Sequence, residues 1–579
     1  MGPIKVNFGG GNRQRAVVIA PEKAVLKTII NIIGTIIIGA VAYYFMLPPL
    51  NLKAMEFYFF IGVICAGYAV MSIITSRAIT RPEYMPYVTH RQIIPPLIVL
   101  GVAVVVMLTG LVVSSVVFRA KEYSKLLPVE TGNFSEDIKE IDFSSVPRLD
   151  DDSSAALAKR KLGDLIDYVS QYEVDTHQTQ INYKNHPVRV TPLRYAGIIK
   201  WLANTRQGIP AYVIVNMTTQ QTELVELEEN IRYTTAEHFG KRLSRHLRFQ
   251  YPTFMFDEPS FEIDENGHPY WICARIDKTI GFMGGDDVIG AVVCDAVTGE
   301  CNYYAIDQIR TDKSLQWIDR VYTPQLIIQQ YDYSGQFKNG FWNSLLAQKD
   351  VKVTTEGYNY LALNDDVYFY TGVTSVTSDQ SIVGFVLVNQ RTKEADFYKI
   401  GGAKELSAKE SAQGQVQQYG YVATFPILLN IEGQPTYFMT LKDKDNLVKM
   451  YAMVNVSQYN VVKTATTLEE CQANYVKALQ TELKLDIDTE DNKVDTDKNE
   501  EIQTPSTAVK TISGKIADIR TSVIGGESYY YIKLEKGTAY YKTSASKMEE
   551  VVILNKGDEI TVTYTEDGKG SIINIIDIK

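Results

Sequence analysis

Residues 94–118 read IPPLIVLGVAVVVMLTGLVVSSVVF, and positions 97–117 of this stretch carry no charged residue. Crossing about 30 Å of hydrocarbon takes about 20 consecutive apolar residues in a helix. Two earlier runs, at residues 24–47 and 57–74, are almost as apolar. The sequence therefore predicts a three-helix transmembrane anchor at residues 24–118, followed by a much larger polar body.

The basic residues around the anchor are unevenly distributed. The first loop holds only Lys53, whereas the amino-terminal part and the second loop hold most of them: Lys5, Arg13, Arg15, Lys23, Lys27, Arg77, Arg81 and Arg91. Lys and Arg concentrate on the cytoplasmic side of membrane proteins. The basic residues that follow the third run point the other way but are fewer: Arg119, Lys121 and Lys125. We therefore expect a multi-pass protein of the cell membrane with a cytoplasmic tail at residues 1–23 and an extracytoplasmic body.

The composition is that of a folded protein without affinity for polyanions. Apolar residues make up 45% of the chain and charged residues 22%, and the formal net charge is −10. An acidic chain of this kind is not expected to bind nucleic acid. The 37 tyrosines favour β-structure, because Tyr packs on a sheet while its hydroxyl stays in water.

Cysteine and histidine give no metal-binding or catalytic signature. The five cysteines include no CxxC pair, and the six histidines form no HExxH motif. The sequence also lacks a GxSxG elbow and a P-loop, so we expect neither an enzyme nor a cofactor or metal site. Cys294 and Cys301 flank the turn in CDAVTGEC and could face each other across a hairpin. They could then form a disulfide in an oxidising compartment or remain thiols.

Residues 119–209 predict a polar connector with an amphipathic helix near residues 154–171, because leucines recur there at helical spacing. A second helix is predicted from Thr234, where a capping box with Glu237 opens the pattern TTAEHFGKRLSRHLR. Its basic residues form one cationic face: Lys241, Arg242, Arg245 and Arg248. This face could dock an acidic partner or a lipid headgroup, or it could be a solvated helix face.

The body repeats a β pattern. Residues 270–306 read as a strand, the loop GFMGGDD, a strand, the turn DAVTGE and a strand, and the same order recurs about 95 residues later. Looser versions occur near residues 210 and 435. The pattern predicts two α+β sheet domains, at residues 210–345 and 346–484. The loop at residues 281–287 is the best candidate for an interaction loop, the alternative being a plain strand connection, because it combines two glycines with two acids: Gly284, Gly285, Asp286 and Asp287.

The last domain boundary, at residues 485–507, is marked by a change in amino-acid composition. Residues 485–507 are acidic and nearly free of aliphatic side chains, which predicts a flexible linker. Residues 508–579 contain five strand patterns with a short helix between the third and the fourth. This order resembles an OB-type β-barrel. We expect the barrel to act in protein contact or assembly.

The hairpin VVCDAVTGECNYY resembles the sheet hairpin of PepSY and related cystatin-like extracytoplasmic modules, which carry an aspartate, a threonine and a glycine in the turn. The matching residues here are Asp295, Thr298 and Gly299. The second copy lacks the glycine and has Asn389, Thr392 and Lys393. As a whole, the chain resembles large membrane-anchored extracytoplasmic proteins of Gram-positive bacteria. This resemblance implies an architecture rather than a biochemical role.

Together these patterns predict an α+β multidomain membrane protein with duplicated antiparallel-sheet domains and a carboxyl-terminal barrel. The function we expect is that of a membrane-anchored extracytoplasmic scaffold that assembles as a homo-oligomer. The alternative is a regulatory binding module that senses or inhibits an extracytoplasmic peptidase or cell-wall enzyme, as the hairpin resemblance implies. The expected partners are the membrane, further copies of the chain and an extracytoplasmic protein.

Overall fold

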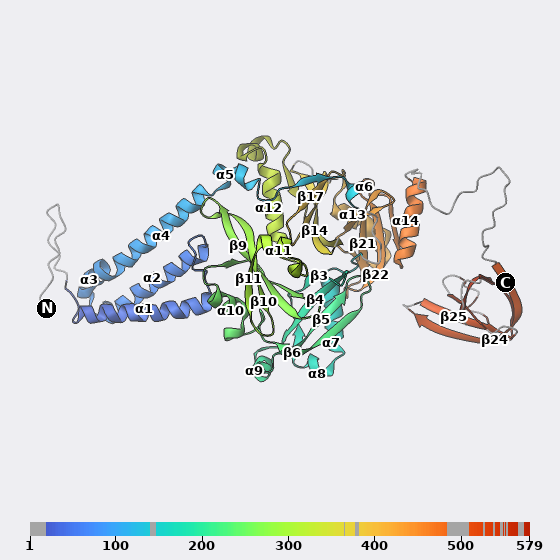
Figure 1. Cartoon of the computed structure of the whole chain (residues 1–579), viewed down its shortest axis with the longest axis horizontal. Helices are drawn as coiled ribbons and strands as arrows, with labels where there is room; N and C mark the ends of the chain where they lie inside the picture. The colour runs from blue at the N-terminus through green and yellow to red at the C-terminus, as the bar shows by residue number, and fades with distance from the viewer. Residues whose placement is uncertain are drawn as a thin grey trace. The chain divides into compact units, whose positions relative to one another are not determined.

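The computed structural model describes residues 19–138, 146–363, 365–376, 381–482, 509–524, 527–535, 539–544, 548, 551, 554–565 and 572–578 (Figure 1). The chain divides into two compact units, Met1–Ile487 and Asp488–Lys579. Most of the predicted cytoplasmic tail and the whole predicted linker at residues 485–507 lie outside the described residues. The fold mixes helices with mostly antiparallel sheets, as the sequence predicts.

Among the described residues, three helical segments are long and apolar enough to cross a membrane, which confirms this part of the prediction. The first two are α1 (Ala24–Met46) and α2 (Met55–Ser76). The third joins short pieces to one long helix: η1 (Pro82–Tyr84), α3 (Met85–Val88), η2 (Thr89–Ile93) and α4 (Ile94–Val113). Many of their aliphatic side chains are exposed, as expected of a surface that lipid covers.

Polar side chains connect the anchor helices to one another. Asn31 of α1 donates to the Ser72 hydroxyl of α2 over 3.0 Å, and Thr75 of α2 donates to the Asn31 side-chain oxygen over 2.6 Å. Gln92 of η2 donates to the Thr28 hydroxyl of α1 over 2.9 Å. Such bonds give a helix a preference for another helix over lipid, which apolar contact alone does not provide.

In the described part of the body, four larger sheets share one topology, in which two short strands pair with the first of three further strands. The first sheet has the order β2-β4-β5-β6 with β3 also on β4: β2 (Tyr172–Val174), β3 (Thr179–Tyr183), β4 (His186–Tyr195), β5 (Ile209–Asn216) and β6 (Thr222–Ile231). The second has the order β11-β10-β9-β7 with β8 also on β9: β7 (Met255–Phe256), β8 (Ser260–Ile263), β9 (Pro269–Ile280), β10 (Gly284–Asp295) and β11 (Cys301–Ala305).

The third sheet has the order β1-β17-β16-β14-β12 with β13 also on β14: β1 (Glu130–Gly132), β12 (Lys352–Thr354), β13 (Asn359–Leu363), β14 (Asp366–Ser375), β16 (Gly384–Asn389) and β17 (Ala395–Tyr398). The fourth has the order β19-β21-β22-β23 with β20 also on β21: β19 (Val422–Ala423), β20 (Ile427–Ile431), β21 (Gln434–Lys442), β22 (Val448–Asn455) and β23 (Val462–Ala465). A small pair, β15 (Ser381–Ile382) and β18 (Gly402–Ala403), lies beside them. The first sheet has strands on both sides of residue 209, where the sequence predicts the end of the connector. The domain limits at residues 209, 345 and 484 stay a prediction.

Helices and helical turns connect and cover these sheets. Those of the first half are α5 (Val116–Tyr123), α6 (Phe134–Asp137), α7 (Asp151–Gly163), α8 (Ile166–Val169), α9 (Ile198–Asn204), η3 (Phe239–Lys241) and α10 (Leu243–Gln250). Those of the second half are α11 (Ile306–Thr311), η4 (Lys313–Leu315), α12 (Pro324–Phe337), η5 (Asn343–Ala347), α13 (Glu405–Gln415), η6 (Gln417–Tyr419) and α14 (Leu468–Glu482). The amphipathic helix predicted near residues 154–171 corresponds to α7 and α8.

The same kind of turn joins the last two of the three longer strands in the first three sheets, and the first two of them, β21 and β22, in the fourth sheet. Each turn begins with an Asn or Asp residue whose side-chain oxygen accepts two backbone N–H groups. These residues are Asn216, Asp295, Asn389 and Asp443. Each turn also contains a residue with φ between 61° and 80°: Gln220, Gly299, Lys393 and Asn446. The turn residues that resemble the PepSY hairpin therefore satisfy a backbone geometry that recurs along the chain.

The two central sheets are buried on both faces. Trp271 and Ile272 are neighbours in β9 but belong to different cores, one shared with the first sheet and one shared with the third. Phe369 and Tyr370 in β14 likewise separate the core shared with the second sheet from the core shared with the fourth. Successive strand residues point to opposite faces, so the strands carry long apolar runs and the four sheets form one continuous packed body.

The second unit contains a closed barrel with the order β24-β25-β26-β28-β27. Its strands are β24 (Val509–Ile524), β25 (Glu527–Leu534), β26 (Tyr540–Ser544), β27 (Glu559–Thr565) and β28 (Ile572–Ile578). Buried side chains such as Ile532, Leu534 and Val562 fill its interior. Closure removes the free strand edges that an open sheet of this size would expose.

Candidate functional site

The predicted interaction loop at residues 281–287 is the tip of the β9–β10 hairpin and contacts the end of α4. The Ser114 hydroxyl accepts the backbone N–H groups of Phe282 and Met283 over 2.8 and 2.9 Å. A Cβ atom on Gly284 would collide with the Tyr123 hydroxyl and with Ser114. The glycine is therefore required by a close approach between the body and its own anchor.

The two acids of this loop are bound inside the body. Asp286 forms an ion pair with Lys278 over 2.5 Å, and Asp287 forms one with Lys393 over 2.7 Å. Gln330 of α12 also donates to the Asp287 carboxylate. Asp286 and Asp287 therefore bind side chains of the same chain.

The helix predicted from Thr234 begins only at Leu243. Thr234 accepts the backbone N–H of Glu237 over 3.0 Å, as in a cap. However, the Glu237 carboxylate accepts the indole N–H of Trp201 over 2.6 Å, so it does not complete the capping box. Phe239 then adopts a φ of 51°, which is incompatible with a continuous right-handed helix.

Two of the four predicted cationic residues bind the carboxyl-terminal end of α1. Arg245 donates to the carbonyl oxygen of Tyr44 over 3.1 Å, and Arg248 donates to that of Leu47 over 3.0 Å. A helix carboxyl terminus presents free carbonyl oxygens and a partial negative charge, so arginine is a suitable partner. Lys241 donates to the Thr205 carbonyl oxygen over 2.7 Å, and Arg242 is exposed.

Replacing Arg248 with alanine is expected to weaken the contact between α10 and the carboxyl-terminal end of α1. Arg248 is 8% exposed and also donates to the carbonyl oxygen of Phe254 over 2.5 Å. Loss of such charge-assisted bonds is expected to cost about 2 kcal/mol of unfolding free energy. Faster hydrogen exchange at residues 43–54 of the detergent-solubilised protein would report the loosening. Arg242→Ala is the matched control, and equal exchange in the two variants would contradict the assignment.

Cys294 and Cys301 are paired across β10 and β11, and their sulfurs form a disulfide with a length of 2.00 Å. His246 lies close enough that its ring nitrogen and the two sulfurs are within 4.8 Å of one another. The His246 Nε2 atom is 2.7 Å from the Gly299 carbonyl oxygen. A thiolate is the metal-binding form of cysteine, so the oxidised pair offers no such ligand.

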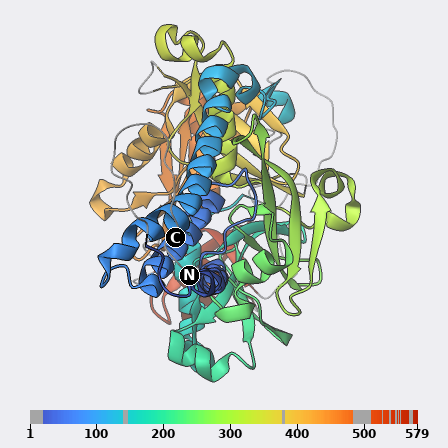
Figure 2. The ribbon, with the colours of Figure 1, turned by 90° about the vertical axis from the view of Figure 1, so that its left-hand side faces the viewer.

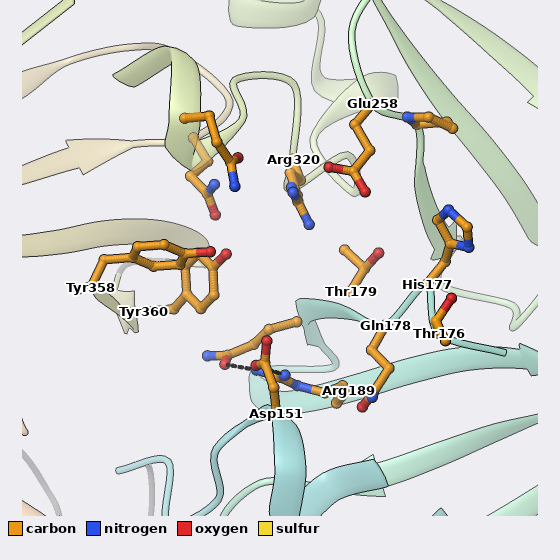
Figure 3. A pocket seen from close by; sticks show the side chains of 14 residues that line it. Asp151, Thr176, His177, Gln178, Thr179, Arg189, Glu258, Arg320, Tyr358 and Tyr360 are labelled. Carbon is orange, nitrogen blue, oxygen red and sulfur yellow. Dashed lines mark hydrogen bonds and ion pairs between the residues drawn. The ribbon is translucent and has the colours of Figure 1, made fainter. Parts of the chain in front are cut away.

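A polar cavity of about 210 Å³ lies where the first three sheets meet (Figure 3). Thr179 and Gln180 come from β3, Arg189 comes from β4, and Tyr360 comes from β13. Arg320 reaches the cavity from the segment before α12. Figure 3 shows the Arg320 guanidinium and the hydroxyls of Tyr358 and Tyr360 pointing into the same space.

Several buried polar atoms at this cavity have no hydrogen-bond partner among the described residues. They are the Nε atoms of Arg189 and Arg320, the Oε1 atoms of Gln178 and Gln390, and the Nε2 atom of Gln180. An unsatisfied buried polar group costs about 1 to 3 kcal/mol. A cluster of such atoms around one cavity is typical of a binding site, because a polar ligand can satisfy them together.

The cavity lining carries two guanidinium groups, Arg189 and Arg320, and two carboxylates, Asp151 and Glu258. Arg189 is 3% exposed, and burial lowers its pKa to about 10, so it stays charged at neutral pH. One of its nitrogens donates to Asp151, whose side chain is 73% exposed at the rim. Burial raises the pKa of Tyr360 to about 12, which keeps its hydroxyl neutral. His177 donates a hydrogen bond to the Asp175 carboxylate, which raises the pKa of His177 and favours its charged form.

Two buried acids lie directly behind Arg320. The Glu262 carboxylate accepts the backbone N–H groups of Asp319 and Arg320 over 2.9 and 3.1 Å. Asp319 accepts the backbone N–H of Asn182 in β3 over 2.7 Å. Burial raises the pKa of Glu262 to about 7, and burial together with the charge of Glu262 raises that of Asp319. The acids fix the backbone that positions Arg320.

The sequence analysis did not find this cavity. Its residues come from eight separate segments between residues 151 and 390, and they share no spacing motif. The one local signal is Arg189, a charged residue inside the apolar strand pattern of β4. Such a residue is almost never fully buried without a partner, and it could have marked the site.

Comparison with known proteins gives no relative for the chain: no family model, no curated protein and no solved structure matches it.

Proposed function

We propose that this protein is a membrane-anchored binding module whose body captures a small anionic ligand in the cavity at Arg189 and Arg320. The observation that carries the proposal is the set of unsatisfied buried donors and acceptors around two guanidinium groups. Guanidinium groups match carboxylate and phosphate groups in shape and charge. The glutamine amides and tyrosine hydroxyls suit a ligand that also carries hydroxyl or amide groups.

This proposal agrees with the alternative expected from the sequence, a regulatory binding module. The anchor is joined to the body at two ends, through Arg248 at α1 and through Ser114 at α4. Ligand binding between the sheets could therefore alter how the body sits on the anchor. The proposed orientation has the body outside the cytoplasm, where the ligand would be an extracytoplasmic carboxylate or phosphate compound and a peptidase or cell-wall enzyme would be the regulated partner.

The test is direct binding by the full-length protein in mild detergent. A panel of small carboxylates, sugar acids and phosphate esters is titrated by calorimetry, and we expect one class to bind. Arg320→Met removes one guanidinium group and is expected to weaken binding about 10- to 100-fold. Arg160→Met is the matched control, because Arg160 lies exposed on α7 outside the cavity. Equal affinity in the two variants, or no binding by any member of the panel, would refute the proposed site.

The homo-oligomeric scaffold expected from the sequence is the second candidate. It is favoured by an apolar surface on α9, where Ile198, Ile199 and Leu202 are 54%, 75% and 64% exposed. Exposed apolar patches commonly mark protein contacts. The native mass of the full-length protein in mild detergent separates the two candidates, because a scaffold gives a discrete multiple of 65.1 kDa. Under either candidate function, we also propose that the sheets are PepSY-like and that the barrel is OB-like.

A further inference from the structure

A groove of about 770 Å³ begins where the chain leaves the third anchor helix. Its first lining residues, Ser124 and Lys125, follow α5 directly, and α5 follows α4 after two residues. The eight residues of α5 span about 12 Å. The mouth of the groove therefore lies within reach of lipid headgroups at the end of the span.

Positive charge is concentrated at this groove in a chain whose net charge is −10. Lys125, Lys338 and Lys352 line it, and Asp350 is the one acid among its lining residues in the described chain. Within the described residues, none of these lysines forms an ion pair. Burial and the charges of Lys338 and Lys399 lower the pKa of Lys352. An anion placed among these groups would relieve their mutual repulsion.

Part of the wall of the groove is apolar. Leu127 and Tyr331 are buried side chains of this wall, and the Lys352 ammonium lies 4.1 Å from the ring centre of Phe397. The lining therefore combines a cationic site with an apolar surface. An amphiphile with a phosphate headgroup has the same two parts.

An exposed apolar segment continues this surface toward the membrane. Trp342, Leu345 and Leu346 are 65%, 57% and 74% exposed. Figures 1 and 2 show the segment that follows α12 beside α5 at the end of α4. Packing of Phe341 against the cluster that contains Tyr123 of α5 agrees with the pictures. Tryptophan beside lysine at the end of a span is typical of the membrane interface.

We propose that this groove binds the phosphate headgroup of an anionic membrane lipid, with Trp342, Leu345 and Leu346 inserted in the interfacial layer of the body-side leaflet. The lysines supply the attraction, at about 1 kcal/mol for each lysine near a charged lipid surface. The groove begins directly after α4 and α5, at the end of the membrane span, and this position favours a lipid over a soluble phosphate. The site is separate from the cavity at Arg320 and does not depend on the function proposed for it.

The experiment uses the full-length protein in phosphatidylcholine vesicles that contain lipid brominated near the headgroup. Quenching of tryptophan fluorescence by brominated phosphatidylglycerol is compared with quenching by brominated phosphatidylcholine. The chain has four tryptophans. Trp342 is more exposed than Trp201 and Trp271, which are 8% and 0% exposed. We expect a clear preference for phosphatidylglycerol in the wild type and none in Trp342→Phe.

The double variant Lys338→Gln/Lys352→Gln is expected to lower the preference for phosphatidylglycerol about 25-fold. The control Lys444→Gln/Lys477→Gln removes two exposed lysines from the fourth-sheet region and should leave the preference unchanged. Equal quenching by both lipids in the wild type, or an unchanged preference in the groove variant, would overturn the proposal. Loss of the preference on adding millimolar inorganic phosphate at constant ionic strength would assign the groove to a soluble phosphate and overturn the lipid.

Discussion

Replacing Arg391 with methionine is expected to lower the free energy of unfolding of the first unit by about 3 to 5 kcal/mol. The Arg391 guanidinium binds the Asp366 carboxylate at both oxygens, with two nitrogen–oxygen distances of 2.7 Å. The side chains are only 10% and 11% exposed. Methionine fills most of the same volume, so the main effect is to leave the Asp366 charge buried without its partner.

The position of this pair explains why its loss should matter for the whole body. Asp366 begins β14, and Arg391 lies in the turn between β16 and β17, where Asn389 also donates to Asp366 over 2.8 Å. A further Arg391 nitrogen donates to the carbonyl oxygen of Ile309 in α11 over 3.4 Å. The pair thus joins the third sheet to the helix that follows the second sheet.

Denaturant unfolding of the full-length protein in detergent, followed by tryptophan fluorescence, measures the effect. The companion variant Asp366→Asn/Arg391→Met removes both charges and is expected to recover part of the lost stability, because no unpaired charge remains buried. Lys313→Met, at an exposed position on η4, controls for loss of a surface cation. A cost below about 1 kcal/mol for Arg391→Met would show that the pair behaves as a solvent-screened surface pair.

The architecture could be predicted from the sequence to the extent that it depends on local pattern. The span at residues 94–118 has the length that a bilayer requires, and the structure has a long apolar helix there. The strand–turn–strand repeat was also visible, because its turns reuse an Asx residue and a position with positive φ. Two of the four sheets were recognised only loosely. Gln220, Lys393 and Asn446 satisfy the turn without a glycine, so glycine does not mark every copy.

The candidate site could not be predicted, because its position is set by packing between sheets. Arg189, Arg320 and Tyr360 lie in different sheets or connections and meet only after the first three sheets have stacked. Arg245 and Arg248 show the opposite error, since their charge was noticed but their partner was not. A surface helix and a helix that binds the carbonyl oxygens at the end of α1 have the same sequence pattern.

Raising the pH from about 5 to about 7.5 is expected to destabilise the first unit by about 3 kcal/mol through the buried acids behind Arg320. Burial raises the pKa of Glu262 from 4.5 to about 7, and burial with the neighbouring Glu262 charge raises that of Asp319. Between these values the folded protein holds a proton that the unfolded chain has released. The stabilisation is therefore complete below about pH 4.5 and is lost as the pH rises through about 7.

The variant Asp319→Asn isolates the part of this contribution that comes from Asp319. Asparagine keeps a side-chain oxygen that can accept the backbone N–H of Asn182, and it removes one acid and its repulsion of Glu262. The free energy of unfolding is expected to change less over the same pH range, by the part that Asp319 contributes, and to exceed that of the wild type at about pH 7.5. His177 has a raised pKa and contributes in the same direction, so the comparison between variants, rather than the wild-type slope alone, identifies the acids.

The control Asp312→Asn removes an exposed acid whose pKa is lowered by its hydrogen bonds to Ser314. That group loses its proton at a pH below the tested range, so the wild-type pH dependence should persist in this variant. If Asp319→Asn retained the full pH dependence, Asp319 would be ionised in the fold at about pH 5.5, and the backbone N–H of Asn182 would outweigh burial. In that case the negative charge of Asp319 would lie behind Arg320 at neutral pH and compete with any anion for its guanidinium. The same measurement thus bears on stability and on the charge that the cavity offers to its ligand.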